Sequence, residues 1–384
     1  MKSQACLLLA ASTLFLTACS GVSPSADSLA EKIPGEAQAP SRIESIPEQA
    51  AADLHRIAQE AGEAPPLIWQ RIAQNFAFSH LYDDPRVVAQ KQRYLQRERL
   101  LLVTSQRSEP FIYFILNEIE RRNMPSELAI LPFIESGYYP LARSRSKATG
   151  LWQFTSQTAR QFRLKRTCCY DARYDIHAST MAALDYLEEL HAEFDQDWLL
   201  ALMAYNTGPN RLKKVLRSSP AVVRAGDYWN LAVSRETREY VPKLLAFSAI
   251  VADGRLSRTL LYPVADAPHL EILETKKRIS PAKLFKSADV SSSEMRRLNP
   301  AMQHLHYPLP RGYRMLVPRQ KTELVALAME RLPEEPRWYK HRIAHGESLS
   351  VIAVRYGTTV SALRRANKLT SSLILAGKTL IIPH

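Results

Sequence analysis

The stretch FIESGYYPLARSRSKATGLWQF, from Phe133 to Phe154, combines apolar, aromatic and polar residues in an unusual order. It places a single carboxylate, Glu135, in a run of apolar and aromatic residues, and it ends with Gln153 beside a tryptophan. An ionised carboxylate is costly to bury unless it is paired, so in such surroundings it tends to hold a proton instead. The stretch therefore predicts a carboxyl group with a raised pKa.

The residues before Glu135 predict a short helix that ends beside it. Asn123-Met124-Pro125 interrupts the preceding helical pattern, and Ser126 is a suitable N-cap for the segment ELAILPFIES. Pro132 inside this segment is expected to kink the helix, and Gly137 is expected to end it. Glu135 should then lie near the C-terminal end of a kinked helix, at the edge of a loop.

Helical periodicity extends over residues 65–261, which we predict to form a mainly helical domain. With only 12 Gly in 384 residues, a turn-rich all-β fold is disfavoured. The further helices expected in this segment are 106–122, with Pro110 in its first turn, 179–194, 198–203 and 235–251.

The sequence changes character after Leu261 and contains two related segments, 262–330 and 339–384, joined by the Pro-rich stretch RLPEEPRW. Ser293, Met295 and Asn299 of the first segment align with Ser361, Leu363 and Asn367 of the second. Each segment has strand-like stretches at its two ends and helical periods between them. We therefore predict two small βααβ modules.

The charge balance, 51 Lys and Arg against 38 Asp and Glu, gives a net charge of +13 and predicts an anionic partner. Anionic lipid, an acidic polymer and nucleic acid would all satisfy this charge. Because no RNA- or DNA-binding signature accompanies it, we expect no nucleic acid partner.

Residues 1–18 have the composition of a signal peptide, with Lys2 followed by an apolar core and then small residues. Leu16-Thr17-Ala18-Cys19 resembles a bacterial lipobox, which implies a lipid on Cys19; an ordinary signal peptide with an incidental Cys is the alternative. Residues 19–64 are then a lipidated N-terminus and flexible tether. Ser20 resembles the residue found in lipoproteins that are passed on to the outer membrane.

Cys168 and Cys169 are adjacent, and no His or Cys at metal-ligand spacing accompanies them. Two packed thiols are expected, with a strained vicinal disulfide as the alternative. We expect neither a metal site nor a cofactor.

Three short motifs in the helical domain carry polar groups suited to a glycan site: Glu135-Ser136, Gly150-Leu151-Trp152-Gln153 and Ala204-Tyr205-Asn206. Each has an ordinary structural explanation, as a helix end, a tight turn or a helix stop. In this order and spacing, however, they resemble the signature motifs of the lysozyme-like lytic transglycosylases of family 1, over about residues 69–250. Trp152 stands where many members have Met.

The segment 339–384 resembles LysM, a peptidoglycan-binding module, at Gly346-Glu347-Ser348-Leu349, Tyr356-Gly357 and Asn367. The segment 262–330 lacks the opening turn of that pattern and is expected to be a degenerate copy. Residues 339–384 contain seven Lys and Arg and one Glu, which suits the carboxylates of peptidoglycan, although some of these charges will simply be solvated. The expected partners are therefore glycan strands and, through the lipid, a membrane.

The resemblance implies a reaction that needs one carboxyl group. Glu135 would donate a proton to the glycosidic oxygen between N-acetylmuramic acid and N-acetylglucosamine. It would then take a proton from the C6 hydroxyl of the muramic sugar, which closes onto C1 as a 1,6-anhydro ring. Because water does not attack, no second carboxylate is required as a base.

The resemblance also implies supporting roles for the other motif residues. Ser136 and Gln153 would position the muramic sugar, with Trp152-Gln153 forming the wall of the cleft opposite Glu135. Tyr205 and Asn206 would orient Glu135 and contact the sugar, and Tyr240 would support the carboxylate. The loop with Asp171, Arg173 and Asp175 is expected to be a structural salt-bridge cluster, followed by an atypical residue, His177.

Two other functions remain open at this point. A lysozyme-like hydrolase would need a second carboxylate, such as Asp171 or Asp175, across the cleft from Glu135. A cell-wall-binding lipoprotein without catalytic activity would need no intact motifs. The expected form is a monomeric enzyme on the periplasmic side of the outer membrane.

Overall fold

The computed structural model describes residues 66–166, 170–303, 305, 307–335 and 338–383. The predicted signal peptide, Cys19, the tether, Cys168 and Cys169 lie outside the described residues. The described part of the chain consists of a helical region followed by two small modules that each contain a two-stranded sheet. This confirms the predicted fold class. Among the described residues, no helix is long and apolar enough to cross a membrane.

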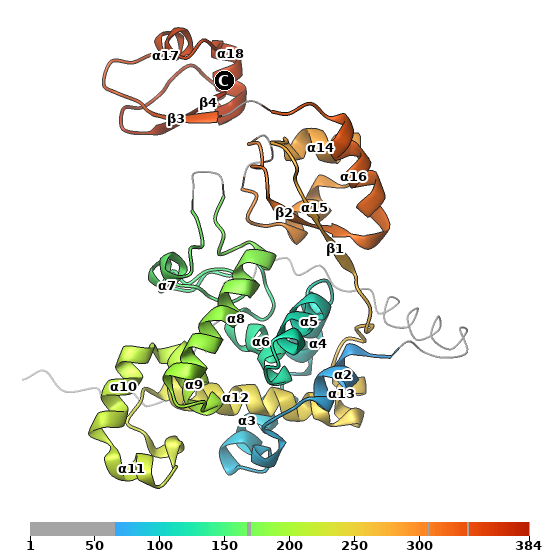
Figure 1. Cartoon of the computed structure of the whole chain (residues 1–384), viewed down its shortest axis with the longest axis vertical. Coiled ribbons are helices and arrows are strands. Elements are labelled where there is room, and N and C mark those ends of the chain that lie inside the picture. The colour runs from blue at the N-terminus through green and yellow to red at the C-terminus, as the bar shows by residue number, and fades with distance from the viewer. Residues whose placement is uncertain (1–65, 167–169, 304, 306, 336–337, 384) are drawn as a thin grey trace, which may run out of the picture. The chain divides into compact units, whose positions relative to one another are not determined.

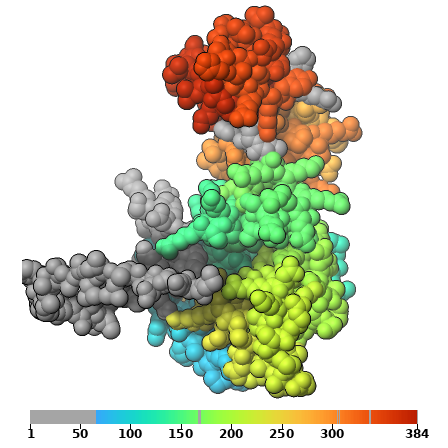
Figure 2. All heavy atoms as spheres, turned by 90° about the vertical axis from the view of Figure 1, so that its left-hand side faces the viewer, coloured from blue at the N-terminus to red at the C-terminus, as the bar shows by residue number. Residues whose placement is uncertain are grey.

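The helical region extends from α2 to α13 (Figure 1). Its elements are α2 (Ile68–Gln74), η1 (Ser79–Leu81), α3 (Pro85–Leu95), α4 (Glu98–Ser108), α5 (Ile112–Arg121), η2 (Ser126–Ile130), α6 (Leu131–Ser136), α7 (Ser156–Gln161), α8 (Ile176–Glu193), α9 (Trp198–Thr207), α10 (Pro209–Ser218), α11 (Pro220–Arg224), η3 (Tyr228–Asn230), α12 (Arg235–Ala252) and α13 (Gly254–Leu260). Figure 2 shows one face of this region, where α10 and α11 form much of the yellow-green surface.

The long helix α12 organises the core of the helical region because it packs against α2, α3, α6 and α9 (Figure 1). Its sequence is almost continuously apolar from Leu244 to Val251, and all of these residues are buried. Phe247 of α12 stacks on Phe133 of α6, with ring centroids 4.4 Å apart. This packing fixes α6, the helix that carries Glu135, against α12.

Two local predictions for the segments before Glu135 are wrong. Ser126 does not cap a helix; its hydroxyl donates to the carbonyl of Ile72 at 2.7 Å, while Pro125 occupies the N-cap position. Pro132 lies in the first turn of α6 rather than inside a kinked helix, because the segment divides into the 3-10 helix η2 and the α-helix α6. A proline lacks the N–H that a helix interior needs, so it favours such a start.

The predicted helix 106–122 is also divided. The helix α4 ends at Ser108 and α5 begins at Ile112, so Pro110 separates two helices instead of starting one. The remaining predicted helices are present with small changes at their ends, as α8, α9 and α12. Gly137 ends α6 as expected, in the left-handed conformation with φ 58°.

The two modules share one βααβ plan (Figure 1). In the first module β1 (Leu270–Glu274) pairs antiparallel with β2 (Arg314–Pro318), and α14 (Pro281–Ser287) and α15 (Ser292–Leu298) lie between them in sequence. The 3-10 helix η4 (Arg319–Lys321) and the helix α16 (Thr322–Arg331) follow. The second module has β3 (Trp338–Arg342), α17 (Leu349–Arg355), α18 (Val360–Asn367) and β4 (Thr379–Pro383), with β3 and β4 antiparallel.

Equivalent asparagines hold the last strand of each module in the same way. Asn299 donates to the carbonyl of Leu316 at 2.7 Å and accepts from its N–H at 2.8 Å. Asn367 makes the same pair of hydrogen bonds with Ile381, both at 2.7 Å. The repeat detected in the sequence is therefore a repeat of structure.

Candidate active site

Glu135 lies in the last turn of α6, immediately before the residue where the helix stops. The left-handed Gly137 closes the helix through its N–H, which donates to Phe133 O at 3.2 Å. A Cβ at Gly137 would lie 3.2 Å from a methyl group of Thr104, a tight contact that adds to the unfavourable positive φ. The sharp end of α6 sets the direction of the Glu135 carboxyl group.

The Glu135 carboxyl group is enclosed by protein although the residue keeps some access to solvent. Burial is the largest influence and raises its pKa. A hydrogen bond that Tyr240 Oη donates to Oε1 lowers the pKa, and the charge of Glu236 raises it. The resulting pKa is about 7, so a substantial fraction of the carboxyl groups carries a proton at neutral pH.

Tyr240 reaches Glu135 from the first half of α12, 105 residues further along the chain. Its ring is buried, with 4% of the residue exposed, and burial raises the pKa of its hydroxyl well above the ordinary value. Tyr240 therefore remains a neutral donor at neutral pH. The predicted contact between Tyr240 and the carboxylate is present.

The Gly150 turn lies against the loop that carries Arg173. Gly150 has φ 83°, and a Cβ added there would lie 1.9 Å from the carbonyl oxygen of Arg173. No side chain can be accommodated at that distance. The glycine of the second motif is thus required by backbone contact.

Trp152 and Gln153 have different surroundings within this turn. Trp152 is fully buried and donates from Nε1 to the Thr180 hydroxyl at 3.0 Å, so it belongs to the core and is not the cleft wall that the sequence suggested. Gln153 is partly exposed, has φ 49°, and donates from Nε2 to the carbonyl of Gly150 at 2.7 Å. The hydrogen bonds described for this side chain use Nε2. Oε1 accepts none of them and can accept one from a ligand N–H or O–H.

Ser136 and Tyr205 join the motifs to one another. The Ser136 hydroxyl lies 2.8 Å from the carbonyl of Leu151 and 3.1 Å from that of Pro132. The Tyr205 hydroxyl donates to the carbonyl of Trp152 at 2.8 Å. Both side chains therefore brace the Gly150 turn, and Ser136, which is buried, uses its donor within the protein.

Asn206 connects the third motif to α12. Its Oδ1 accepts a hydrogen bond from the Thr237 hydroxyl at 2.8 Å. The amide of Asn206 is thereby oriented by the helix that carries Tyr240. Among the side-chain hydrogen bonds described for Glu135, the partner is Tyr240; the described bonds of Tyr205 and Asn206 go to Trp152 and Thr237 instead.

The acidic loop before α8 is a structural cluster. Arg173 and Asp171 form a buried ion pair at 2.7 Å, and Asp175 caps α8 by accepting from Ala178 N at 2.8 Å. Asp175 also accepts a hydrogen bond from the Tyr170 hydroxyl at 2.9 Å. Both carboxylates thus bond to protein groups. His177 stacks on Phe114, and burial lowers the pKa of its ring.

Sequence reasoning missed Glu236, which is exposed in the first turn of α12 and acts electrostatically on Glu135. An acidic residue in a first turn is usual, because it interacts favourably with the helix dipole. Its spacing of four residues from Tyr240 was the available signal, because residues four apart share one face of a helix.

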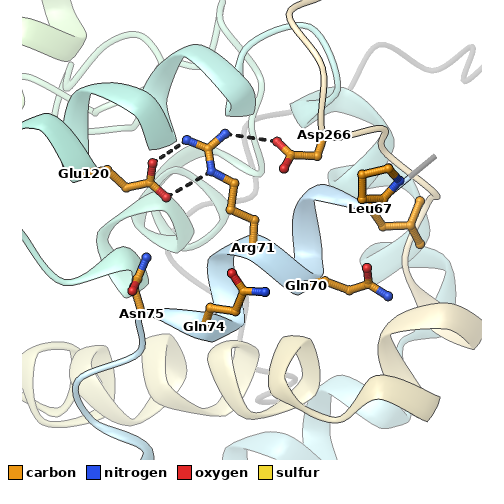
Figure 3. A pocket seen from close by; sticks show the side chains of 8 residues that line it. Leu67, Gln70, Arg71, Gln74, Asn75, Glu120 and Asp266 are labelled. Atoms are coloured by element: carbon orange, nitrogen blue, oxygen red, sulfur yellow. Dashed lines mark hydrogen bonds and ion pairs between the residues drawn. The ribbon is translucent and has the colours of Figure 1, made fainter.

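A separate pocket of about 400 Å³ lies beside α2 (Figure 3). Its lining includes none of the predicted site residues. At its centre Arg71 pairs with Glu120 and with Asp266, the latter at 3.0 Å. The charged side chains of the pocket are therefore paired with one another. Among the described residues, no cluster of three or more His, Cys, Asp and Glu could hold a metal ion.

Comparison with known proteins defines the class of this enzyme. Residues 112–225 match the family model of the transglycosylase SLT domain, and residues 341–383 match the LysM domain. The first range contains Glu135, Gln153 and Asn206, while Tyr240 lies beyond it. The protein is a lytic transglycosylase that acts on peptidoglycan, and it carries a LysM domain.

The chain belongs to the family of membrane-bound lytic murein transglycosylase D. It is 32% identical over 314 residues to the Escherichia coli (strain K12) protein of that name, which covers 78% of this chain and 69% of the relative. It is also 44% identical over 112 residues to a putative tributyltin chloride resistance protein of Alteromonas sp. (strain M-1), over 29% of this chain and 54% of that protein.

One similar solved structure is the 70 kDa soluble lytic transglycosylase of Escherichia coli. It is 23% identical, covers 35% of this chain and 23% of that chain, and has a TM-score of 0.28.

Proposed function

We propose that the protein cleaves the β-1,4 bond between N-acetylmuramic acid and N-acetylglucosamine without water and leaves 1,6-anhydromuramic ends. The observation that carries the proposal is the enclosed Glu135 carboxyl group, whose pKa of about 7 allows it to serve both as an acid and as a base.

In the first step the Glu135 O–H gives its proton to the glycosidic oxygen. The bond from that oxygen to C1 of the muramic sugar breaks, and its electron pair stays with the leaving N-acetylglucosamine. In the second step the C6 hydroxyl oxygen bonds to C1 and its proton passes to the Glu135 carboxylate. The enzyme returns to its starting protonation state, and no water is consumed.

The neighbouring residues support both steps. Tyr240 donates to the carboxylate form and so stabilises it after proton transfer. The surface beside Glu135 is formed or braced by Gln153, Ser136, Tyr205 and Asn206. We assign the sugar contacts to Gln153 and Asn206, because both are partly exposed. Asp171 and Asp175 are committed to Arg173 and to the cap of α8, which disfavours the hydrolase alternative that would use them.

The proposed organisation follows the predicted segments. Residues 65–261 carry out the chemistry, residues 339–384 hold glycan, and 262–330 is a degenerate module between them. A lipid on Cys19 would anchor a monomer at the periplasmic side of the outer membrane.

Substitution of Glu135 tests the catalytic assignment. The Glu135→Gln variant keeps the size of the side chain but removes its acid and base functions, so digestion of purified peptidoglycan should fall by at least about a hundredfold. Asp171→Asn is not a suitable control because it breaks a buried pair. Glu118→Gln is the control, because it alters only a partly exposed pair with Arg121 within α5. Near-normal digestion by a folded Glu135→Gln protein would contradict the assignment.

A further inference from the structure

The first two turns of α12 carry Glu236, Thr237 and Tyr240, and two of these side chains bond to residues of the candidate active site. Tyr240 donates to Glu135, and Thr237 donates to Asn206. Glu236 precedes Tyr240 by four residues, about one helical turn, and therefore lies on the same face of α12. Unlike Tyr240, which is buried, Glu236 is exposed.

Among the groups around Glu135, Glu236 is the one whose charge shifts the pKa of Glu135. The Tyr240 and Tyr205 hydroxyls, from α12 and α9, stay neutral because burial raises the pKa of each well above the ordinary value. On η2, Glu127 accepts a hydrogen bond from Phe78 N instead, and the Arg107 guanidinium of α4 lies over the Tyr139 ring. Neither of these two charged groups is among those that shift the pKa of Glu135.

We propose that Glu236 is a positioning residue that acts through Glu135: its negative charge holds the proton on Glu135 before cleavage and draws a proton back afterwards. The inference rests on the proposed single-carboxylate mechanism. Once Glu135 has protonated the leaving oxygen, its carboxylate carries a negative charge that the charge of Glu236 disfavours. Transfer of the C6 hydroxyl proton to Glu135 removes one of these charges, so the second step relieves the repulsion that the first step creates.

A purely structural role for Glu236 makes a different prediction. An acidic residue in the first turn stabilises a helix through the dipole, and its loss would lower thermal stability without moving the pH profile of activity. The two roles are therefore separated by the pH profile.

The test compares Glu236→Gln with Glu239→Gln in the full-length protein, by measuring kcat/KM on purified peptidoglycan as a function of pH. Removal of the Glu236 charge lowers the pKa of Glu135, so the proton is lost at lower pH. The alkaline limb should move to lower pH by roughly half a unit to one unit. Glu236→Asp keeps the charge, so its alkaline limb should lie close to that of the wild type.

Glu239→Gln is the matched control because Glu239 lies on the same helix but pairs with Arg235 and Lys243, at 3.1 Å each. An unmoved limb in Glu236→Gln, or an equal shift in Glu239→Gln, would overturn the proposal. So would complete loss of activity at every pH in folded Glu236→Gln, which would make Glu236 an essential base. If the proposed function itself is wrong, the products of the wild-type protein will have reducing ends formed by hydrolysis, whatever the pH profiles of the variants.

Discussion

Tyr240 on α12 donates a hydrogen bond to Glu135 on α6, and this contact links the two helices at the centre of the candidate active site. It favours the charged carboxylate, whereas burial and Glu236 oppose it. The pKa of about 7 is the balance of these opposing influences. The influences of Tyr240 and Glu236 can be removed separately, and the expected changes have opposite signs.

Tyr240→Phe should shift the alkaline limb of kcat/KM to higher pH, opposite to Glu236→Gln. Loss of the donated hydrogen bond raises the pKa of Glu135, since the bond stabilises the ionised form. We also expect kcat to fall by about tenfold or more, because the carboxylate is less well oriented and less stabilised. Tyr94→Phe, which alters a tyrosine packed on Phe247 instead, is the control. A limb that moves to lower pH would contradict this account of Glu135.

Gly150→Ala should destabilise the helical region by about 2 kcal/mol or more and reduce activity with it. The positive φ is unfavourable for alanine, and the added Cβ would approach the Arg173 carbonyl to 1.9 Å. Gly226→Ala is a matched control, with φ 65° and no atom within 4 Å of the added Cβ. Thermal unfolding measures both. Equal losses for the two variants would show that backbone strain, and not the contact with Arg173, determines the effect.

Asn367→Ala should lower the free energy of unfolding of the C-terminal module, because it leaves the N–H and carbonyl of Ile381 without their side-chain partner. The expected cost is about 1–3 kcal/mol. Binding of the full-length protein to insoluble peptidoglycan should weaken as the module loses its fold. Asn299→Ala makes the equivalent change in the first module. If it weakens glycan binding equally, the division of roles between the modules is wrong.

Stability of the C-terminal module should decline in acid through Glu347. Its carboxylate accepts hydrogen bonds from Ala344 N, His341 and Arg355, which hold its pKa at about 2. Because the folded pKa lies below the unfolded value of about 4.3, the stabilisation is complete above that value and is lost as pH falls towards 2. Glu347→Gln should make unfolding of the module less sensitive to pH in this window. Unchanged acid sensitivity would exclude Glu347 as its source.

The sequence allowed the modules and the polar centre of the site to be predicted for physical reasons. Asn299 and Asn367 recur in aligned positions because the side chain of each hydrogen-bonds to the backbone of the last strand of its module. The repeat was therefore visible in the sequence alone. The enclosed carboxyl group of Glu135 was evident from its apolar neighbours, and Gly137 from the chemistry of helix ends.

Other features depend on contacts that local sequence does not contain. Trp152 could equally line a cleft or fill a core, and its bond to Thr180, in α8, decides for the core. Ser126 has the chemistry of an N-cap, but the carbonyl of Ile72 takes its hydroxyl. Glu236 was overlooked because a first-turn glutamate is ordinary in any helix, and its influence arises only when α12 packs against α6.

The central claim is that Glu135 transfers protons while the muramic C6 hydroxyl, rather than water, attacks C1. Digestion of purified peptidoglycan in isotopically labelled water, followed by mass spectrometry of the released fragments, tests this claim most directly. We expect 1,6-anhydromuramic ends without label from the cleavage step, and we expect these ends to be absent from the Glu135→Gln digest. Labelled reducing ends formed by the wild-type protein would contradict it and identify a hydrolase.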